Sequence, residues 1–248
     1  MLLTKDIKTL IYTYLYTFAI LMVLPFLINL LTGTLKYFSF TSILKNMPFG
    51  TVFSIYLIVI SSISYESFKM FIQNGISRRT FFIGKLSTLM ILILIGDFIN
   101  LLFGYLIQIP LVGYERFNLF MGSYAGFFHN VFASVLFNYL MSGLLLICLV
   151  TFVMAFGSAM SLLSKRLQRL MVIGIPIIGI ILIFIATSLW HSMAYKGTWM
   201  LNLFKLVVGF NAGNQLNPFP LISFLLVFSI VFAAIARFFF SKKQLKRE

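Results

Sequence analysis

Hydrophobic residues fall into six long stretches along the chain, separated by shorter segments that carry most of the charge. A helix rises about 1.5 Å per residue, so about 20 apolar residues cross the roughly 30 Å hydrocarbon core of a bilayer. The stretches lie near residues 10–31, 49–67, 86–109, 130–160, 170–190 and 219–240. This pattern predicts an all-α membrane protein with six transmembrane helices, in a single transmembrane domain of residues 1–248.

The composition excludes the soluble classes of protein. Of the 248 residues, 61% are hydrophobic and 10% are charged, whereas soluble domains are about a quarter charged. A soluble chain of this size must wet its own exterior and cannot hide so much apolar surface. Cys148 is the single cysteine, which excludes an intrachain disulfide and a thiolate metal cluster.

The positive charges predict the orientation, because cytosolic loops are enriched in Lys and Arg. Placing both termini in the cytosol leaves five of the 19 basic residues outside, namely Lys36, Lys45, Arg116, Lys196 and Lys205. We therefore expect both termini to be cytosolic, as an even number of spans requires. The net charge of +14 then follows from membrane topology, and no nucleic acid is expected as a partner. The basic tail at 242–247 is either a contact surface or an anchor on anionic lipid.

Three segments on the predicted outer face, 32–48, 110–129 and 191–218, mix aromatic residues with Gly and Asn. They are too apolar to be plain loops, so we expect short interfacial or re-entrant helices there. Two interpretations stay open for these helices, which either gate a transport path or anchor the chain at the headgroups.

The chain lacks the residues that a membrane-embedded enzyme needs. Its two histidines are His129 and His191, and it has five acids, too few for a clustered metal site or a credible Ser-His-Asp arrangement. A phosphate-binding loop requires GxxxxGK[ST], but Gly84–Lys85 is followed by Leu86 and preceded at the fifth position by Arg79. No cofactor is expected in this chain, so energy for any work would come from another subunit or an ion gradient.

The segment after the second stretch predicts a short surface helix with a defined end. Its apolar residues recur on one helical face, at Phe68, Phe71, Ile72 and Ile76. Asn74–Gly75 is typical of a helix stop, and Ser77 is typical of the N-cap of a following helix. Such a helix either transmits motion from a soluble partner or is an ordinary connection whose cations reach the lipid phosphates.

Residues Asn74–Leu86, NGISRRTFFIGKL, resemble the signature of the ABC type-2 permease family, the membrane subunits of ATP-binding-cassette exporters. The predicted six spans and cytosolic termini are also similar to that family. The resemblance implies a bacterial plasma membrane protein that forms a dimer, of identical or different permeases, with two cytosolic ATPase subunits that hold ATP and Mg²⁺. Small permeases of this kind are similar to exporters of amphipathic peptides such as bacteriocins, lantibiotics or phenol-soluble modulins. A large outer domain, present in larger family members, is missing.

The same resemblance implies which residues contact the ATPase. The coupling helix would comprise Glu66–Gly75, and the coupling residues would be Glu66, Phe68, Phe71, Ile72, Asn74, Gly75, Ser77, Arg78 and Arg79. A second contact would lie in the next cytosolic loop, at Lys165, Arg166 and Arg169. The simpler alternative for that loop is a positively charged membrane anchor.

Polar residues inside the spans predict a substrate path. Asp97 lies in the middle of the third stretch, where a carboxylate costs several kcal/mol unless it is neutralised or paired. Asn100 and Gln108 share its helix face, and Asn138 belongs to a stripe on the fourth stretch. These four residues form a translocation path that would suit a cationic substrate, or they make hydrogen bonds between packed helices. The alternative function is an ion-driven secondary transporter that uses Asp97.

Overall fold

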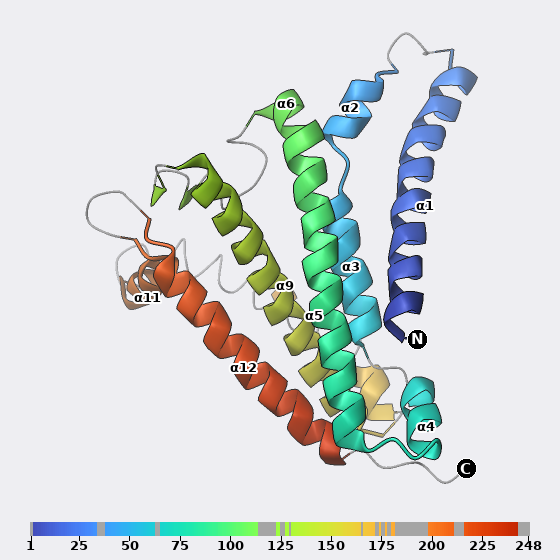
Figure 1. The fold of residues 1–248 in the computed structure, drawn as a ribbon, viewed down its shortest axis with the longest axis vertical. Helices are drawn as coiled ribbons and strands as arrows, with labels where there is room; N and C mark the ends of the chain where they lie inside the picture. Colours follow the sequence, from blue (N-terminus) through green and yellow to red (C-terminus); the bar gives the residue numbers. More distant parts are fainter. Residues whose placement is uncertain are drawn as a thin grey trace. The chain divides into compact units, whose positions relative to one another are not determined.

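The computed structural model describes residues 2–33, 38–62, 65–113, 123–124, 127–128, 130–164, 166–171, 174, 177, 180–181, 198–210 and 216–242 (Figure 1). Within these residues the chain is helical, apart from turns and one isolated β-bridge between Phe210 and Leu216. The chain divides into two compact units, residues 1–61 with 80–150 and residues 62–79 with 151–248.

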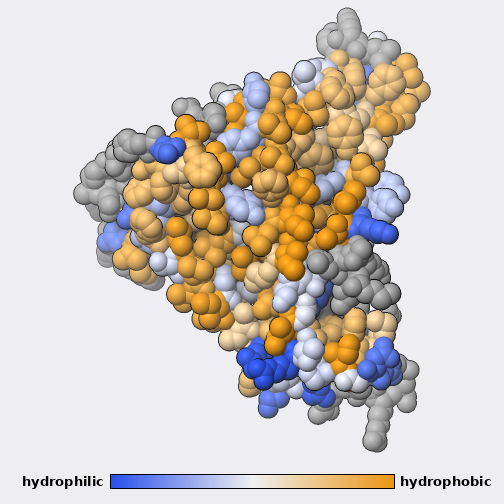
Figure 2. Space-filling view, in the orientation of Figure 1, coloured by the Kyte–Doolittle hydropathy of each residue, from blue (hydrophilic) through white to orange (hydrophobic). Residues whose placement is uncertain are grey.

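Four helical segments are long and apolar enough to cross a membrane: Asp6–Leu31, Arg78–Leu111, Val131–Met160 and Phe219–Lys242. Their outward side chains are largely apolar, as the hydropathy of the surface shows (Figure 2). Apolar surface of this extent is stable against lipid rather than water. The protein is therefore embedded in a membrane, as the hydrophobic pattern predicts.

The first unit contains α1 (Leu2–Leu31), α2 (Phe40–Lys45), α3 (Phe49–Ser61) and most of α5 (Arg78–Phe103). Helix α5 continues without a break through a π-helical turn, η2 (Gly104–Gln108), into α6 (Ile109–Val112). The first two-thirds of α9 (Val131–Met160) complete the unit. Helices α1 and α3 lie side by side (Figure 1), and the ring of Tyr14 meets that of Phe49 edge-on at 5.3 Å.

The second unit contains α4 (Tyr65–Gln73), the end of α9, α11 (Thr198–Val208) and α12 (Phe219–Lys242). Phe152 of α9 meets Phe232 of α12 with ring centroids 5.2 Å apart. Helix α11 ends at Val208, and the next residue, Gly209, has a φ of 77° that brings its backbone against the Asn217 carbonyl, where no side chain would fit. The amide N–H of Asn217 donates to the Gly209 carbonyl at 2.8 Å, which closes the turn into α12.

Several predicted boundaries differ from the structure. The second stretch, predicted to span 49–67, is helical as α3 for only 13 residues, so about 20 Å of helix forms there. The chain bends at Ser62, and α4 begins at Tyr65 as a separate helix. Most of the fifth stretch, 170–190, lies outside the described residues. Six spans, cytosolic termini and a single domain therefore stay predictions.

Short helices do occur in two of the segments that were predicted to be interfacial. Helix α2 lies within 32–48, where Ser39 caps its start by accepting the Ser42 N–H at 3.3 Å. Helix α11 lies within 191–218. Most of the third segment, 110–129, falls outside the described residues. Whether these helices gate or anchor stays open.

Candidate functional site: a polar cavity and a surface helix

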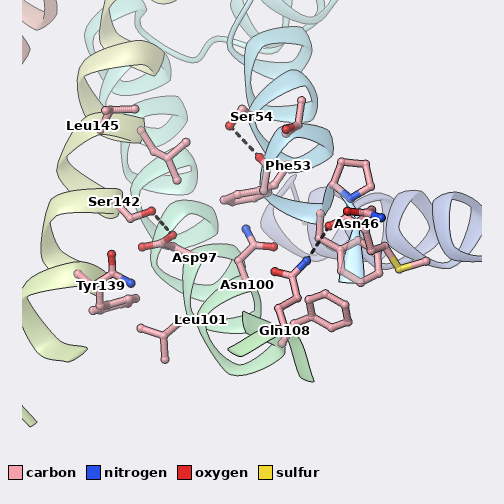
Figure 3. A pocket seen from close by; sticks show the side chains of 18 of the residues that line it. Asn46, Phe53, Ser54, Asp97, Asn100, Leu101, Gln108, Tyr139, Ser142 and Leu145 are labelled. Carbon is pink, nitrogen blue, oxygen red and sulfur yellow. Dashed lines mark hydrogen bonds between the residues drawn. The ribbon is translucent and has the colours of Figure 1, made fainter. Parts of the chain in front are cut away.

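A cavity of about 450 Å³ lies inside the first unit, between helices that are otherwise apolar (Figure 3). Helices α3, α5 and α9 form its walls, and η2 and the Lys45–Pro48 link also contribute lining residues. Among the lining residues that the structure describes, Asp97 and Lys45 carry charged side chains. Asp97 is 4% exposed, whereas Lys45 is exposed. A buried acid and a set of amides and hydroxyls are thus gathered at one place.

Asp97 is held between α5 and α9. Its Oδ1 accepts a hydrogen bond of 2.6 Å from the Ser142 hydroxyl, which Figure 3 shows as a dashed line. Its Oδ2 is buried and has no hydrogen-bond partner among the described residues. Oδ2 faces Gly143, where a methyl group in place of the hydrogen would lie 3.6 Å away. The carboxyl group therefore has one satisfied and one unsatisfied oxygen, inside a membrane-spanning helix.

Two asparagines occupy the same cavity and differ in their hydrogen bonds. Asn100 lies one turn beyond Asp97 on α5, and its Oδ1 accepts a 3.1 Å hydrogen bond from the Tyr14 hydroxyl of α1. Asn138 of α9 is 4% exposed, and its Oδ1 finds no partner in the described part of the chain. A buried amide oxygen without a donor costs free energy, so a hydrogen-bond donor placed beside this oxygen would stabilise it.

Gln108 fixes the end of the cavity near the Lys45–Pro48 link. Its Nε2 donates to the Met47 carbonyl at 3.1 Å and to the Lys45 carbonyl at 3.4 Å. Gln108 is the last residue of the π-helical turn η2, and such turns insert an extra residue per turn and occur frequently at functional sites. The amide thus ties the α2–α3 connection to the wall that carries Asp97.

On the side of the cavity opposite Ser142, the aromatic side chain of Phe53 forms the wall. Phe53 of α3 is fully buried, and its ring covers Gly96 so closely that a methyl group at position 96 would overlap Cζ, Cε1 and Cε2. Glycine at 96 therefore lets α3 and α5 approach one another at the cavity. Tyr139 of α9 lies on the other side, and its hydroxyl donates to the Leu94 carbonyl at 3.0 Å.

All four residues of the predicted translocation path, Asp97, Asn100, Gln108 and Asn138, line this one cavity. Sequence reasoning missed Tyr139 and the contact of Phe53 with Gly96. A glycine one residue before a mid-span acid is the only local signal for that contact. The transport role of these residues stays a prediction.

The predicted surface helix exists as α4 and ends as its sequence indicates. Gly75 has φ of 80°, the Gly75 N–H donates to the Ile72 carbonyl at 3.1 Å, and the Ile76 N–H donates to the Phe71 carbonyl at 3.1 Å. These two bonds and the left-handed glycine form a Schellman motif, the commonest glycine-based helix end. The next helix, α5, begins at Arg78, directly after Ser77. The helix stop predicted at Asn74–Gly75 is confirmed.

The apolar face of α4 makes contacts within the chain. Phe68 is fully buried, and its ring packs edge-on against Phe240 of α12, with centroids 5.3 Å apart. Arg78, at the start of α5, donates from Nη1 to the Ser241 carbonyl in the last turn of α12 at 2.9 Å. Both residues are predicted to contact an ATPase, and in the structure they make these contacts within the chain; the partner contact stays a prediction. A guanidinium also suits the partial negative charge at a helix C-terminus.

The remaining residues predicted for the partner contact are distributed along α4 and the following turn. Phe71 and Ile72 are half-buried, whereas Asn74, Gly75, Ser77 and Arg79 are exposed. The side chain of Glu66 lies outside the described residues. Met70 is 51% exposed and Gln73 is also exposed, which sequence reasoning did not single out. Helical geometry puts both of them opposite Phe68.

In the second loop, Arg166 and Arg169 are exposed, and Lys165 lies outside the described residues. Gln168 lies between the two arginines, and its side chain points back toward α9. Its Nε2 donates to the carbonyls of Met160 at 2.9 Å and Leu163 at 3.1 Å. This side chain thus bonds the last carbonyl of α9 and a carbonyl of the turn that follows it. The loop therefore has a fixed form that presents two arginines to solvent or headgroups.

The described residues contain no group of three or more His, Cys, Asp or Glu that could hold a metal ion. Comparison of the chain with protein-family models, with curated proteins and with solved structures gives no significant match. The function must therefore be inferred from the residues of the chain itself.

Proposed function

We propose that this chain is the permease subunit of an ATP-binding-cassette exporter in the bacterial plasma membrane. It would move an amphipathic peptide, or a similar hydrophobic substrate, outward with energy from a separate ATPase. The observation that carries the proposal is the continuity of α4 with α5: a short amphipathic helix ends at Gly75, and three residues later begins the helix that holds Asp97. The resemblance of Asn74–Leu86 to the permease signature supports it.

The geometry of α4 suits a coupling helix that is displaced by a partner subunit. Its end is fixed by the Schellman hydrogen bonds at Gly75, and α5 begins after only Ile76 and Ser77. Phe68 and Arg78 connect the same region to the last turn of α12. A displacement of α4 would therefore reach two membrane helices at once, which is what coupling to an ATPase requires.

The exposed side of α4 is the surface that we assign to the ATPase. Met70 and Gln73 lie opposite the buried Phe68 ring, so they are free to contact a partner. Met adapts its shape readily, which favours its use in protein interfaces. In the permease dimer, each copy would present this surface to one of two ATPase subunits.

An ion-driven secondary transporter is the second candidate, because one specific observation favours it. Asp97 is a buried acid with an unsatisfied oxygen in a spanning helix, as expected for the site of a coupling ion. Such transporters also have broken helices at the binding site. The described part of α5 instead continues through the π-helical turn into α6 without a break, so we place this function second.

The test is purification of the tagged chain from its native cells in a mild detergent. We expect an ATPase with a phosphate-binding loop to co-purify and to hydrolyse ATP in the complex. Met70→Glu should lower its recovery about fivefold or more, because a central apolar contact at an interface commonly contributes over 1 kcal/mol. The matched control is Lys8→Gln, which changes the net charge equally at another exposed position.

Gel filtration and circular dichroism establish that both variants are folded. Recovery of no ATPase, together with uptake or efflux driven by an ion gradient in proteoliposomes of the chain alone, would overturn the proposal in favour of the second candidate. Equal ATPase recovery with Met70→Glu and Lys8→Gln would reject the assignment of the docking surface on α4.

A further inference from the structure

Two buried oxygen atoms at the cavity have no hydrogen-bond donor in the part of the chain that the structure describes. They are Oδ2 of Asp97 and Oδ1 of Asn138, which belong to helices α5 and α9, and each side chain is 4% exposed. Leaving a buried acceptor unpaired costs about 1–3 kcal/mol, and more when it is charged. The pair is therefore complementary to a ligand that brings hydrogen-bond donors and positive charge.

Gly143 of α9 faces the unsatisfied oxygen of Asp97. A methyl group built at Gly143 would have a single neighbour within 4 Å outside its own helix, namely Oδ2 of Asp97 at 3.6 Å. A protonated primary amine is about as large as a methyl group and has three N–H donors. Gly143 therefore places no side chain against the unsatisfied oxygen.

The rest of the cavity is suited to the apolar part of an organic cation. Four aromatic side chains line it, those of Phe49, Phe53, Phe103 and Tyr139. Aromatic faces attract cations as well as apolar groups. The volume of about 450 Å³ falls within the range of roughly 300–1,000 Å³ that is typical of sites for organic ligands.

An inorganic cation fits these residues less well. Mg²⁺ and Ca²⁺ take about six to eight oxygen ligands in a tight shell. Among the described side chains at the cavity, only Asp97 and Asn138 have a buried oxygen without a partner. An ammonium group needs no more than three acceptors, and the unpaired atoms supply two of them.

We propose that this cavity binds the primary ammonium group of an apolar or amphipathic molecule, with Asp97 Oδ2 and Asn138 Oδ1 as acceptors and the aromatic wall around its hydrocarbon part. The assignment of this ammonium to the exported substrate rests on the proposed function. The binding itself does not, because it needs only the cavity of the purified chain.

The test is equilibrium binding of tritiated phenylethylammonium to the purified chain in lipid nanodiscs, by scintillation proximity. This probe combines one ammonium with one aromatic ring. Neutral phenylethanol and anionic phenylacetate serve as competitors, and neither should displace it. Asp97→Asn should weaken binding about tenfold or more, since hydrogen bonds to charged groups contribute about 1.5–3 kcal/mol.

The matched control is Asp6→Asn, which removes an acid with a similarly unpaired Oδ2 that does not line the cavity. Its affinity should stay within about twofold of the native value, as for a change remote from the site. Gly143→Ser is a second variant, in case Asp97→Asn does not fold. Its hydroxyl would lie beside Oδ2, supply the missing donor and so weaken binding.

Equal affinity of the native chain, Asp97→Asn and Gly143→Ser would overturn the proposal, as would displacement by phenylethanol as effective as by unlabelled probe. Binding of ²²Na⁺ that depends on Asp97, without binding of the amine, would overturn it in favour of an inorganic cation. Amine binding that depends on Asp97 in a chain that recruits no ATPase would support the cavity assignment and reject the exporter.

Discussion

The contact between Phe53 and Gly96 gives the sharpest test of how α3 and α5 form the cavity. In the native structure the fully buried ring of Phe53 fills the space where a side chain at position 96 would begin. Gly96→Ala adds a single methyl group that overlaps the ring. The variant can form only if the ring turns away or the two helices separate, and either change disturbs the cavity wall.

The expected magnitude follows from two opposing effects. Overpacking of a well-packed contact by one methyl group costs about 1–3 kcal/mol, while replacing a helical glycine by alanine gains up to about 1 kcal/mol from helix propensity. Gly143→Ala makes the same chemical change on α9, where the added methyl would meet only Asp97 Oδ2 at an ordinary contact distance of 3.6 Å. The propensity gain cancels in this comparison, so Gly96→Ala should be less stable than Gly143→Ala by about 1–3 kcal/mol.

The assay is equilibrium unfolding in mixed micelles, with helix content followed by circular dichroism as the fraction of SDS increases. A double-mutant cycle with Phe53→Leu adds a second criterion, because a smaller side chain at 53 makes room for the methyl group. The double variant should then lose less stability than the sum of the single variants, by about 0.5–3 kcal/mol. If Gly96→Ala is as stable as Gly143→Ala, or if the cycle is additive, the close packing of α3 on α5 described above is wrong.

Two further predictions use the same unfolding measurement. Gly75→Ala should lose about 1 kcal/mol, because a Cβ atom opposes the left-handed conformation that ends α4 at φ of 80°; Gly84→Ala, at an open helical position, should lose nothing, and equal effects would contradict the Schellman geometry. Ser142→Ala should cost about 1–3 kcal/mol, because among the described residues it removes the only donor to a buried carboxyl group. Ser54→Ala, which removes a bond to its own helix at Gly50, should cost no more than about 0.5 kcal/mol. If both serine variants are equally stable, the bond to Asp97 contributes nothing.

Features that depend on neighbouring residues were predictable from the sequence. The end of α4 at Asn74–Gly75 and the start of α5 after Ser77 follow from local chemistry, because a glycine cap and a hydroxyl cap act within one helical turn. The break between α3 and α4 was not predictable in this way. The sequence Ser61-Ser62-Ile63-Ser64 contains neither Gly nor Pro, so hydropathy alone merged the two helices into one stretch.

The candidate site likewise combines features that the sequence predicts with features that it does not. Periodicity placed Asp97, Asn100 and Gln108 on one face of α5, and a polar face inside a membrane seeks a protein or cavity partner. Which residue of another helix meets that face depends on how the helices are shifted along one another, and hydropathy does not determine this shift. The bond of Ser142 to Asp97 and the contact of Phe68 with Phe240 therefore required the structure. The π-helical turn at Gly104–Gln108 has no clear sequence signal either.

The contacts of α4 also bear on whether it is a coupling helix or only an anchor on the membrane surface. An anchor helix on a membrane surface would turn its apolar side chains toward lipid. Here Phe68, on the apolar face, is fully buried against Phe240, and Arg78 holds the adjoining turn to Ser241, so this face serves contacts within the chain. The exposed side carries Met70 and Gln73, which are poorly placed to insert into lipid if the opposite face is already occupied. From Arg78 to Asp97 the helix is continuous over about 30 Å. These contacts favour a helix that packs within the chain over one that merely rests on the bilayer.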